Sequence, residues 1–163
     1  MRPHALLLLA ALSLIAADKA KKPKPADKEK SGAKTDEELI QGKWRVRELW
    51  TKGELEDDPK LKATYTQSVY TFSGNQLISH WKEKLTSKGT YKLDSTKNPK
   101  EMIAKVKIFT GQEFTKPYIY KIEGDKLTLC LGETMPTDFT TKNGKRMLII
   151  LKRMPKKKPQ PKD

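Results

Sequence analysis

Apolar and polar residues alternate in short runs along most of this chain, and the alternation predicts β-strands. In residues 43–50, Trp44, Val46, Glu48 and Trp50 fall on one face of an extended segment. In residues 102–109, Met, Ala, Val and Ile alternate in the same way with Ile, Lys, Lys and Phe. Further strands are predicted at 67–73, 76–83, 88–93, 118–123, 126–131, 137–141 and 146–152.

The connections between these runs are short and carry turn residues. Gly74-Asn75, Gly124-Asp125 and Asn143-Gly144 each stand between two predicted strands, which is typical of β-hairpins. Short connections favour an up-and-down order, and about eight such strands close into a barrel without exposed edges. The predicted fold is therefore an all-β, up-and-down β-barrel of about eight short antiparallel strands. It has no internal repeat and no second domain.

One short helical turn is expected before the first strand. Thr35 is followed three residues later by Glu38, the spacing of a capping box. Gly42 then provides the backbone freedom to leave the turn and enter the strand that carries Trp44.

Both ends of the chain differ in composition from the middle. Residues 1–17 hold one early cation and an apolar run, which predicts a signal peptide that is too short to span a bilayer. Residues 18–34 are a Lys/Pro-rich linker and residues 154–163 a basic tail, and both are expected to be disordered. The barrel domain is assigned to residues 35–153. An extracytoplasmic location, periplasmic or secreted, is expected, with no transmembrane segment after cleavage.

The charge of the chain is concentrated in these ends. Of the net charge of +14, the segments 1–34 and 152–163 each contribute +5 and residues 35–151 only +4. The two basic ends contain no aromatic residues, so they can attract a polyanion but cannot stack on bases. Solvated linkers and attachment to anionic envelope polymers both remain open, and no specific nucleic acid is expected as a partner.

Several longer motifs resemble a known family. Leu39-x-Gly-x-Trp44 is followed by TFSGNQL, GTYKLDSTKNPK, IYKIEGDKLTLCLG, PTDF and a final LKR that ends at Arg153. In this order the motifs are similar to a family of uncharacterised, exported lipocalin-like domains that is expanded in planctomycete bacteria. The family usually has an acidic residue at the position of Ala104 and an arginine at that of Met135, and this chain departs from it at both.

The resemblance implies how the barrel is closed. In lipocalin-like barrels the first-strand tryptophan packs at the closed end, with an arginine of the last strand over its indole. Gly42, Trp44 and Arg153 are therefore expected to be structural closure residues, with a cation–π contact between Trp44 and Arg153.

The alternation also gives a candidate interior. A small eight-stranded barrel is either filled by such side chains or keeps room for one small ligand, and the sequence leaves both open. If there is room, aromatic hydroxyls would suit a ligand with an apolar body and a polar group. Glu48, as an inward acid, would pair with a cation. The candidate ligand-binding residues are Tyr70, Trp81, Tyr91, Tyr118, Tyr120 and Glu48. The full predicted interior is Trp44, Val46, Tyr70, Phe72, Leu77, Trp81, Tyr91, Leu93, Tyr118, Tyr120, Leu127, Leu129, Ile149 and Leu151.

No catalytic constellation, metal-spaced cluster or cofactor motif is found in the sequence. His80 is the single histidine after residue 17 and is expected to face outward, while Cys130 alternates with leucines and is expected to be a buried, unreactive thiol. A Cys130–His80 nucleophile pair is compatible with a barrel, but nothing local supports it.

Two functions are carried forward. The first is an exported, monomeric module that binds a small apolar or amphipathic ligand. The alternative is a filled-barrel interaction protein that its basic tails tether to anionic envelope polymers.

Overall fold

The computed structural model describes residues 33–155, which form nine strands and two short helices. The predicted signal peptide at 1–17, the predicted linker up to residue 32 and the tail from residue 156 lie outside the described residues. The elements are α1 (Asp36–Leu39), β1 (Gly42–Thr51), β2 (Glu54–Leu55), α2 (Pro59–Tyr65), β3 (Ser68–Ser73), β4 (Gln76–Trp81), β5 (Lys84–Asp94), β6 (Lys100–Ile108), β7 (Glu113–Glu123), β8 (Lys126–Gly132) and β9 (Arg146–Arg153).

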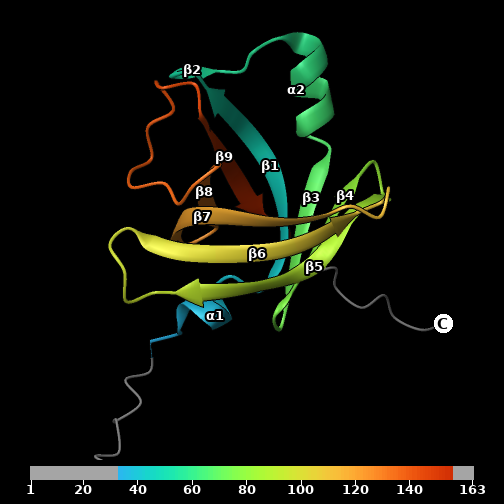
Figure 1. Ribbon diagram of the computed structural model, residues 1–163. Helices are drawn as coiled ribbons and strands as arrows, with labels where there is room; N and C mark the ends of the chain where they lie inside the picture. The colour runs from blue at the N-terminus through green and yellow to red at the C-terminus, as the bar shows by residue number, and fades with distance from the viewer. Residues whose placement is uncertain (1–32, 156–163) are drawn as a thin grey trace, which may run out of the picture. The chain divides into compact units, whose positions relative to one another are not determined.

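Eight of the strands close into one antiparallel barrel (Figure 1). From β3 to β9 each strand pairs with the next along the chain, and β1 pairs with β3 on one side and β9 on the other. The two-residue β2 forms a short hairpin with the end of β1. The prediction of an all-β, lipocalin-like up-and-down barrel is confirmed.

The helical turn before the barrel has the predicted capping box. The Thr35 side chain accepts a hydrogen bond of 3.3 Å from the Glu38 backbone N–H, and Glu38 Oε2 accepts one of 2.9 Å from the Thr35 N–H. Gly42 has a φ of +115°, which L side chains rarely adopt. The chain can therefore turn sharply from α1 into β1.

The two ends of the barrel differ, because α1 lies at only one of them (Figure 1). At the end where β1 starts and β9 finishes, α1 lies across the strands (Figure 1), and we call this the closed end. The opposite end, where β1 finishes and β9 starts, we call the open end. The largest fully buried side chains near the closed end are Ile40, Trp44, Phe72, Met102, Tyr120, Leu127 and Leu151.

A β-bulge in β1 changes which residues face the interior. Val46 and Leu49 both pair with inward residues of β9, although three positions separate them. One residue is therefore inserted between them, and Glu48 lies on the outer face, where its Oε2 accepts a hydrogen bond of 3.0 Å from Trp50 Nε1. The predictions that Glu48 faces the interior and that Trp50 shares a face with Trp44 were wrong, because an extra residue reverses the alternation beyond it.

Two connections also differ from the predicted pattern. The strand predicted at 137–141 is absent, since residues 133–145 form an irregular connection and β8 pairs directly with β9. Asn143-Gly144 therefore does not join two strands of a hairpin. The β4–β5 hairpin turns at Lys82 and Glu83, with φ values of 48° and 66°. Asn and Gly are the usual residues for such a turn, so no local signal in the sequence indicated it.

Several residues outside the barrel interior are also buried, on β7, on β8 and in the irregular connection that follows β8. Ile119 and Cys130 pair across β7 and β8 and face away from the interior, yet neither has any exposed surface. Pro136 and Thr141 of the connection are buried as well, and Thr141 Oγ1 accepts a hydrogen bond of 2.9 Å from the Gly53 N–H. The predicted burial of Cys130 is confirmed.

Candidate functional site

The closed end is sealed by contacts between Arg153 and the first strand. The guanidinium carbon of Arg153 lies 4.0 Å from the centroid of the fully buried Trp44 ring. Its Nη1 and Nη2 atoms donate hydrogen bonds of 2.6 Å each to the carbonyls of Gln41 and Leu39. Trp44 Nε1 donates in turn to the Ile40 carbonyl at 2.7 Å. These groups are occupied by the protein itself, as expected for closure residues.

Tyr91 and Tyr120, both candidate ligand residues, belong to this sealed end. The Tyr91 hydroxyl donates a hydrogen bond of 2.7 Å to the Gly74 carbonyl, and the Tyr91 ring packs edge-on against Phe72. The Tyr120 hydroxyl donates to the Asp36 carboxylate at 2.7 Å. Both hydroxyls therefore hold the closed end together.

The Asp36 carboxylate fastens α1 to the barrel. It accepts hydrogen bonds from Tyr120 and from Lys100 Nζ, the latter at 2.8 and 3.0 Å. Partial burial acts to raise the pKa of Asp36, but the hydrogen bonds from Lys100 and Tyr120 and the Lys100 charge outweigh it and hold the pKa below the ordinary 3.8. Burial and the bond to Asp36 raise the pKa of Tyr120. In the folded protein, an ionised Asp36 thus accepts the hydrogen bond of a neutral Tyr120.

Tyr118, which is buried, and Tyr70, which is partly buried, also face the interior and keep free hydroxyls. Each pairs with an inward neighbour, Trp44 for Tyr70 and Met102 for Tyr118. Burial raises the pKa of both phenols, and the pKa of Tyr118 is raised further by the nearby Tyr70. Neither hydroxyl has a hydrogen-bond partner among the described residues, and each hydroxyl oxygen keeps some accessible surface. They are polar groups available to a bound molecule or to water.

The remaining two candidates lie elsewhere. Trp81 is half-buried at the open end, where its Nε1 donates a hydrogen bond of 2.9 Å to the Thr64 carbonyl and so attaches α2 to β4. Glu48 is on the outer face of β1. Of the six candidates, the structure leaves free interior hydroxyls at Tyr70 and Tyr118 alone.

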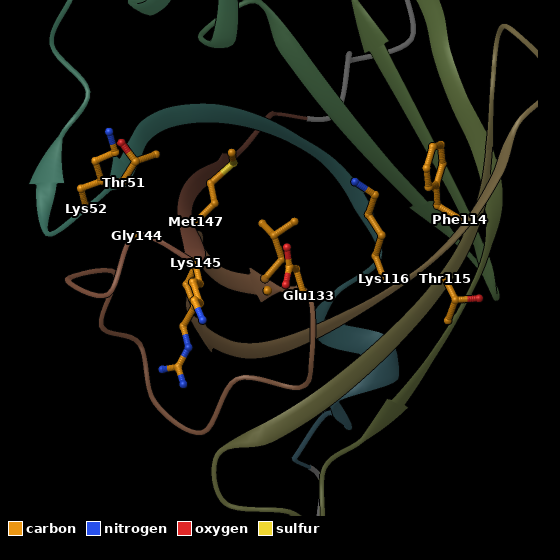
Figure 2. A pocket seen from close by; sticks show the side chains of 12 residues that line it. Thr51, Lys52, Phe114, Thr115, Lys116, Glu133, Gly144, Lys145 and Met147 are labelled. Atoms are coloured by element: carbon orange, nitrogen blue, oxygen red, sulfur yellow. The ribbon is translucent and has the colours of Figure 1, made fainter.

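A cavity of about 640 Å³ opens at the open end of the barrel (Figure 2). Thr51, Met147 and Leu131 pair with one another across β1, β9 and β8, and Phe114 comes from β7. Met147 is the inward residue before Ile149, so its exposed side chain belongs to the mouth rather than to the outer wall. The other lining residues are Lys52, Thr115, Lys116, Gly132, Glu133, Gly144, Lys145 and Arg146.

None of the six candidate residues lines this cavity, and the lining residue of greatest chemical interest, Lys116, was not predicted. It pairs with Ala104, which is fully buried on the inner face, so the side chain of Lys116 starts from the interior side of β7. Figure 2 shows this side chain extending from its strand into the mouth. Its Nζ lies 5.5 Å from the centroid of the Phe114 ring, and no carboxylate of the described residues lies within ion-pair distance.

The sequence did contain a pattern that leads to Lys116. It lies two residues before Tyr118 and four before Tyr120, on the inward face of the same strand. The predicted strand begins at residue 118, because a proline such as Pro117 is typical of a strand edge. In the structure Pro117 lies within β7, opposite Ile103 and beyond the last residue that pairs with β8, so no hydrogen bond to β8 is lost there.

The side chains with catalytic potential do not form a site. His80 faces outward on β4, as predicted, and Cys130 faces outward on β8, with β5, β6 and β7 between their strands. Burial raises the pKa of the Cys130 thiol, which disfavours the thiolate. No group of three or more His, Cys, Asp or Glu residues within 33–155 could hold a metal ion, and no helix of this part of the chain is long and apolar enough to cross a membrane.

The fold and the cavity define the class of protein as a lipocalin-like β-barrel that is sealed at one end and open at the other. Comparisons with protein-family models, curated proteins and solved structures find no match. The resemblance to the exported planctomycete family therefore stays a prediction.

Proposed function

We propose that this protein is a binding module for a small amphipathic ligand with an acidic group, held in the open half of the barrel. The observation that carries the proposal is Lys116, an interior-facing cation with no carboxylate partner among the described residues, beside the apolar Phe114, Leu131 and Met147. An acidic group at Lys116 would place the apolar part of a ligand against these three side chains.

The charge of the cavity lining supports an acidic ligand. Lys52, Lys116 and Lys145 line it together with a single acid, Glu133. The fourth cation, Arg146, is already paired with a carboxylate outside the lining at 2.8 Å. Three cations without an ion-pair partner in residues 33–155, against one acid, attract an anion into a partly enclosed mouth. Screening is weaker at the partly buried Lys116 than at Lys52 and Lys145, which are exposed.

The neighbour of Lys116 gives further support. Ala104 stands opposite Lys116 in the β6–β7 register. The family that this sequence resembles usually has an acidic residue at that position, which would neutralise Lys116 from within the barrel. With alanine there, Lys116 has no carboxylate from the opposite strand and keeps its charge for a ligand.

A second hollow, of about 710 Å³, lies at the closed end, and its lining contains the lysines Lys34 and Lys43 but also two acids, Glu38 and Asp125. It is lined by Gln41 and Arg153 among others, and both are engaged within the protein. Arg153 Nε contacts Asp125 at 3.1 Å, and Gln41 Oε1 accepts a hydrogen bond of 2.8 Å from the Gly74 N–H. The open end is therefore the better ligand site.

The test is a titration with dansylundecanoic acid as the probe and its methyl ester as the uncharged counterpart. Lys116→Met keeps the length of the side chain and removes its charge. We expect this variant to bind the acid about fivefold more weakly, the effect of one partly exposed ion pair. Its affinity for the ester should be unchanged. Lys92→Met, at an exposed outward position of β5, is the matched control and should match the wild type with both probes.

A second variant tests the same idea from the opposite strand. Ala104→Glu would supply an internal carboxylate to Lys116 and should weaken acid binding without weakening ester binding, with thermal unfolding confirming that the barrel is intact. Equal acid affinity in Lys116→Met and wild type, or no binding of either probe to the wild type, contradicts the proposal.

Native mass spectrometry of the protein from its own host, before any delipidation, addresses the natural ligand. We expect a retained acidic amphiphile and, if the chain is exported, a polypeptide mass that begins at Asp18. A bare polypeptide that also fails to bind the probe would instead favour the filled-barrel alternative.

A further inference from the structure

The exposed apolar side chains of the barrel are concentrated at the open end. Six large apolar residues in the described part of the chain are exposed, and five of them lie on elements that meet at this end. The exception, Ile103, lies in the middle of β6 on the outer wall. The five are Leu55 on β2, Leu61 on α2, Leu85 at the start of β5, Phe109 after β6 and Met147 on β9.

Two of these side chains lie on neighbouring strand ends. Phe109 is 81% exposed and Leu85 is 52% exposed. The Phe109 N–H donates a hydrogen bond of 3.3 Å to the carbonyl of Thr86, the residue next to Leu85, so the two side chains come from adjacent strand ends. The β4–β5 hairpin and the end of β6 also lie together in Figure 1. We call Leu85 and Phe109 the apolar corner.

Lysines are frequent on the strands that carry Leu85 and Phe109. Three of them line a groove of about 440 Å³ between β5, β6 and the start of β7. The acids in the same region are Glu83 and Glu113, and Glu113 lies 3.9 Å from one of the lysines. Five lysines against two glutamates leave the corner positively charged. The five are Lys82 and Lys84 of the β4–β5 hairpin, Lys88 of β5, and Lys105 and Lys107 of β6.

We propose that the apolar corner docks on an anionic lipid surface. The exposed phenyl and leucine side chains would enter the interfacial region of the bilayer, while the surrounding lysines contact anionic headgroups. A second copy of the chain does not fit, because joining two such corners would bring ten lysines together. A nucleic acid is also less suited, since the corner offers one aromatic ring where strand binding uses a series of them. This inference goes beyond ligand binding and does not depend on it.

The test measures binding of the protein, purified as its host produces it, to phosphatidylglycerol-containing and to pure phosphatidylcholine vesicles. Phe109→Ser should weaken binding to the anionic vesicles about tenfold, the effect of losing one buried phenyl group. Ile103→Ser, which removes the 37% exposed apolar side chain from the outer wall, is the matched control and should bind like the wild type. Lys84→Glu should weaken binding to the anionic vesicles alone.

A site-specific readout separates the corner from the basic tails, which all variants share. The wild type already emits from Trp44, Trp50 and Trp81, so emission is compared with it. Phe109→Trp should add an emission that shifts to the blue on vesicle binding and is quenched by brominated lipid, whereas Ile103→Trp should add one that shows neither change. Unaltered vesicle binding in Phe109→Ser, or an indole emission in Phe109→Trp that does not respond to vesicles, overturns the proposal. Tight binding of the corner to an oligonucleotide, abolished by Phe109→Ser, would assign the surface to nucleic acid instead.

Discussion

At the scale of single residues, loss of the Arg153 side chain should destabilise the barrel without changing ligand binding at the open end. It combines a cation–π contact with Trp44 and hydrogen bonds to the carbonyls of Gln41 and Leu39. Arg153→Ala removes all three and leaves two partly buried carbonyls without a partner. We expect a loss of about 3 kcal/mol in the free energy of unfolding, measured by urea denaturation.

The control for this prediction is Arg153→Lys. Lysine keeps the charge but cannot reach both carbonyls with one planar group, so it should recover only part of the stability. Probe binding at the open end should be unchanged in both variants. An alanine variant as stable as the wild type would remove Arg153 from barrel closure.

Asp36 predicts how the stability of the barrel depends on pH. Its pKa is lowered in the folded protein by Lys100 and Tyr120, against the opposing effect of burial. A lowered folded-state pKa stabilises the protein above the unfolded-state value near 3.8, and that contribution disappears as the pH falls through the folded-state pKa. Asp36→Asn should therefore be less stable than the wild type at neutral pH, and the two proteins should converge in acid.

Denaturant unfolding of both proteins across this pH range measures the difference directly. Asp57→Asn is a suitable reference, because Asp57 has no ion-pair or hydrogen-bond partner in the described part of the chain. A constant gap between Asp36→Asn and the wild type down to low pH would show that the carboxylate charge is not what fastens α1.

At the scale of elements, the bulge in β1 reverses which side chains should matter for stability compared with simple alternation. Alternation from Trp44 would place Glu48 inside and Leu49 outside, but the register places Leu49 inside. Leu49→Ala should therefore cost about 2 kcal/mol of unfolding free energy, and Glu48→Ala less than about 1 kcal/mol. Equal costs, or a larger cost for Glu48→Ala, would contradict the bulge.

The same element shows how far sequence alone predicts this barrel. Strand existence, the capping box and the inward face from Trp44 to Val46 follow from local patterns, and all three are present. The bulge does not follow, because an inserted residue depends on how β1 fits against β9 across the whole chain. The turn at Lys82-Glu83 was missed for a related reason, since tertiary pairing imposed positive φ on residues that do not favour it.

The candidate site was predicted only in part, because contacts between distant segments decide which polar groups stay free. Alternation identified the interior tyrosines, yet it could not separate Tyr91 and Tyr120, whose hydroxyls have protein partners, from Tyr70 and Tyr118. That difference depends on α1 and on the β3–β4 turn folding over the closed end. Lys116 lay just outside the predicted strand. The chemistry of a barrel interior thus depends on which hydroxyls and charges other segments satisfy.

At the scale of the whole molecule, the barrel divides stability and recognition between its ends. Arg153, Trp44 and Asp36 hold the closed end with buried or partly buried groups that are paired within the protein. The open end holds exposed apolar side chains, the cavity and a cation that no carboxylate of residues 33–155 neutralises. A ligand and a lipid surface at the same end are compatible, because an amphiphile could then pass between bilayer and barrel without crossing water.

Because much of the positive charge lies at the chain ends, deleting one end distinguishes a ligand-binding barrel from a barrel tethered to anionic polymers by its tails. Residues 156–163 contain four lysines and one aspartate. Deleting them should reduce retention on heparin-agarose and lower the salt at which the protein elutes, because fewer counterions are released on binding. Binding of dansylundecanoic acid should not change, and it should also survive salt concentrations that abolish heparin retention, since apolar burial is not screened. If the deletion weakens probe binding, the tail takes part in the cavity. If the deletion leaves heparin retention unaltered, the polyanion-binding surface is either the basic segment 18–34 or the folded barrel. Removing residues 18–34 as well separates these two, and retention that survives both deletions makes the lysines near Leu85 and Phe109 the first place to mutate.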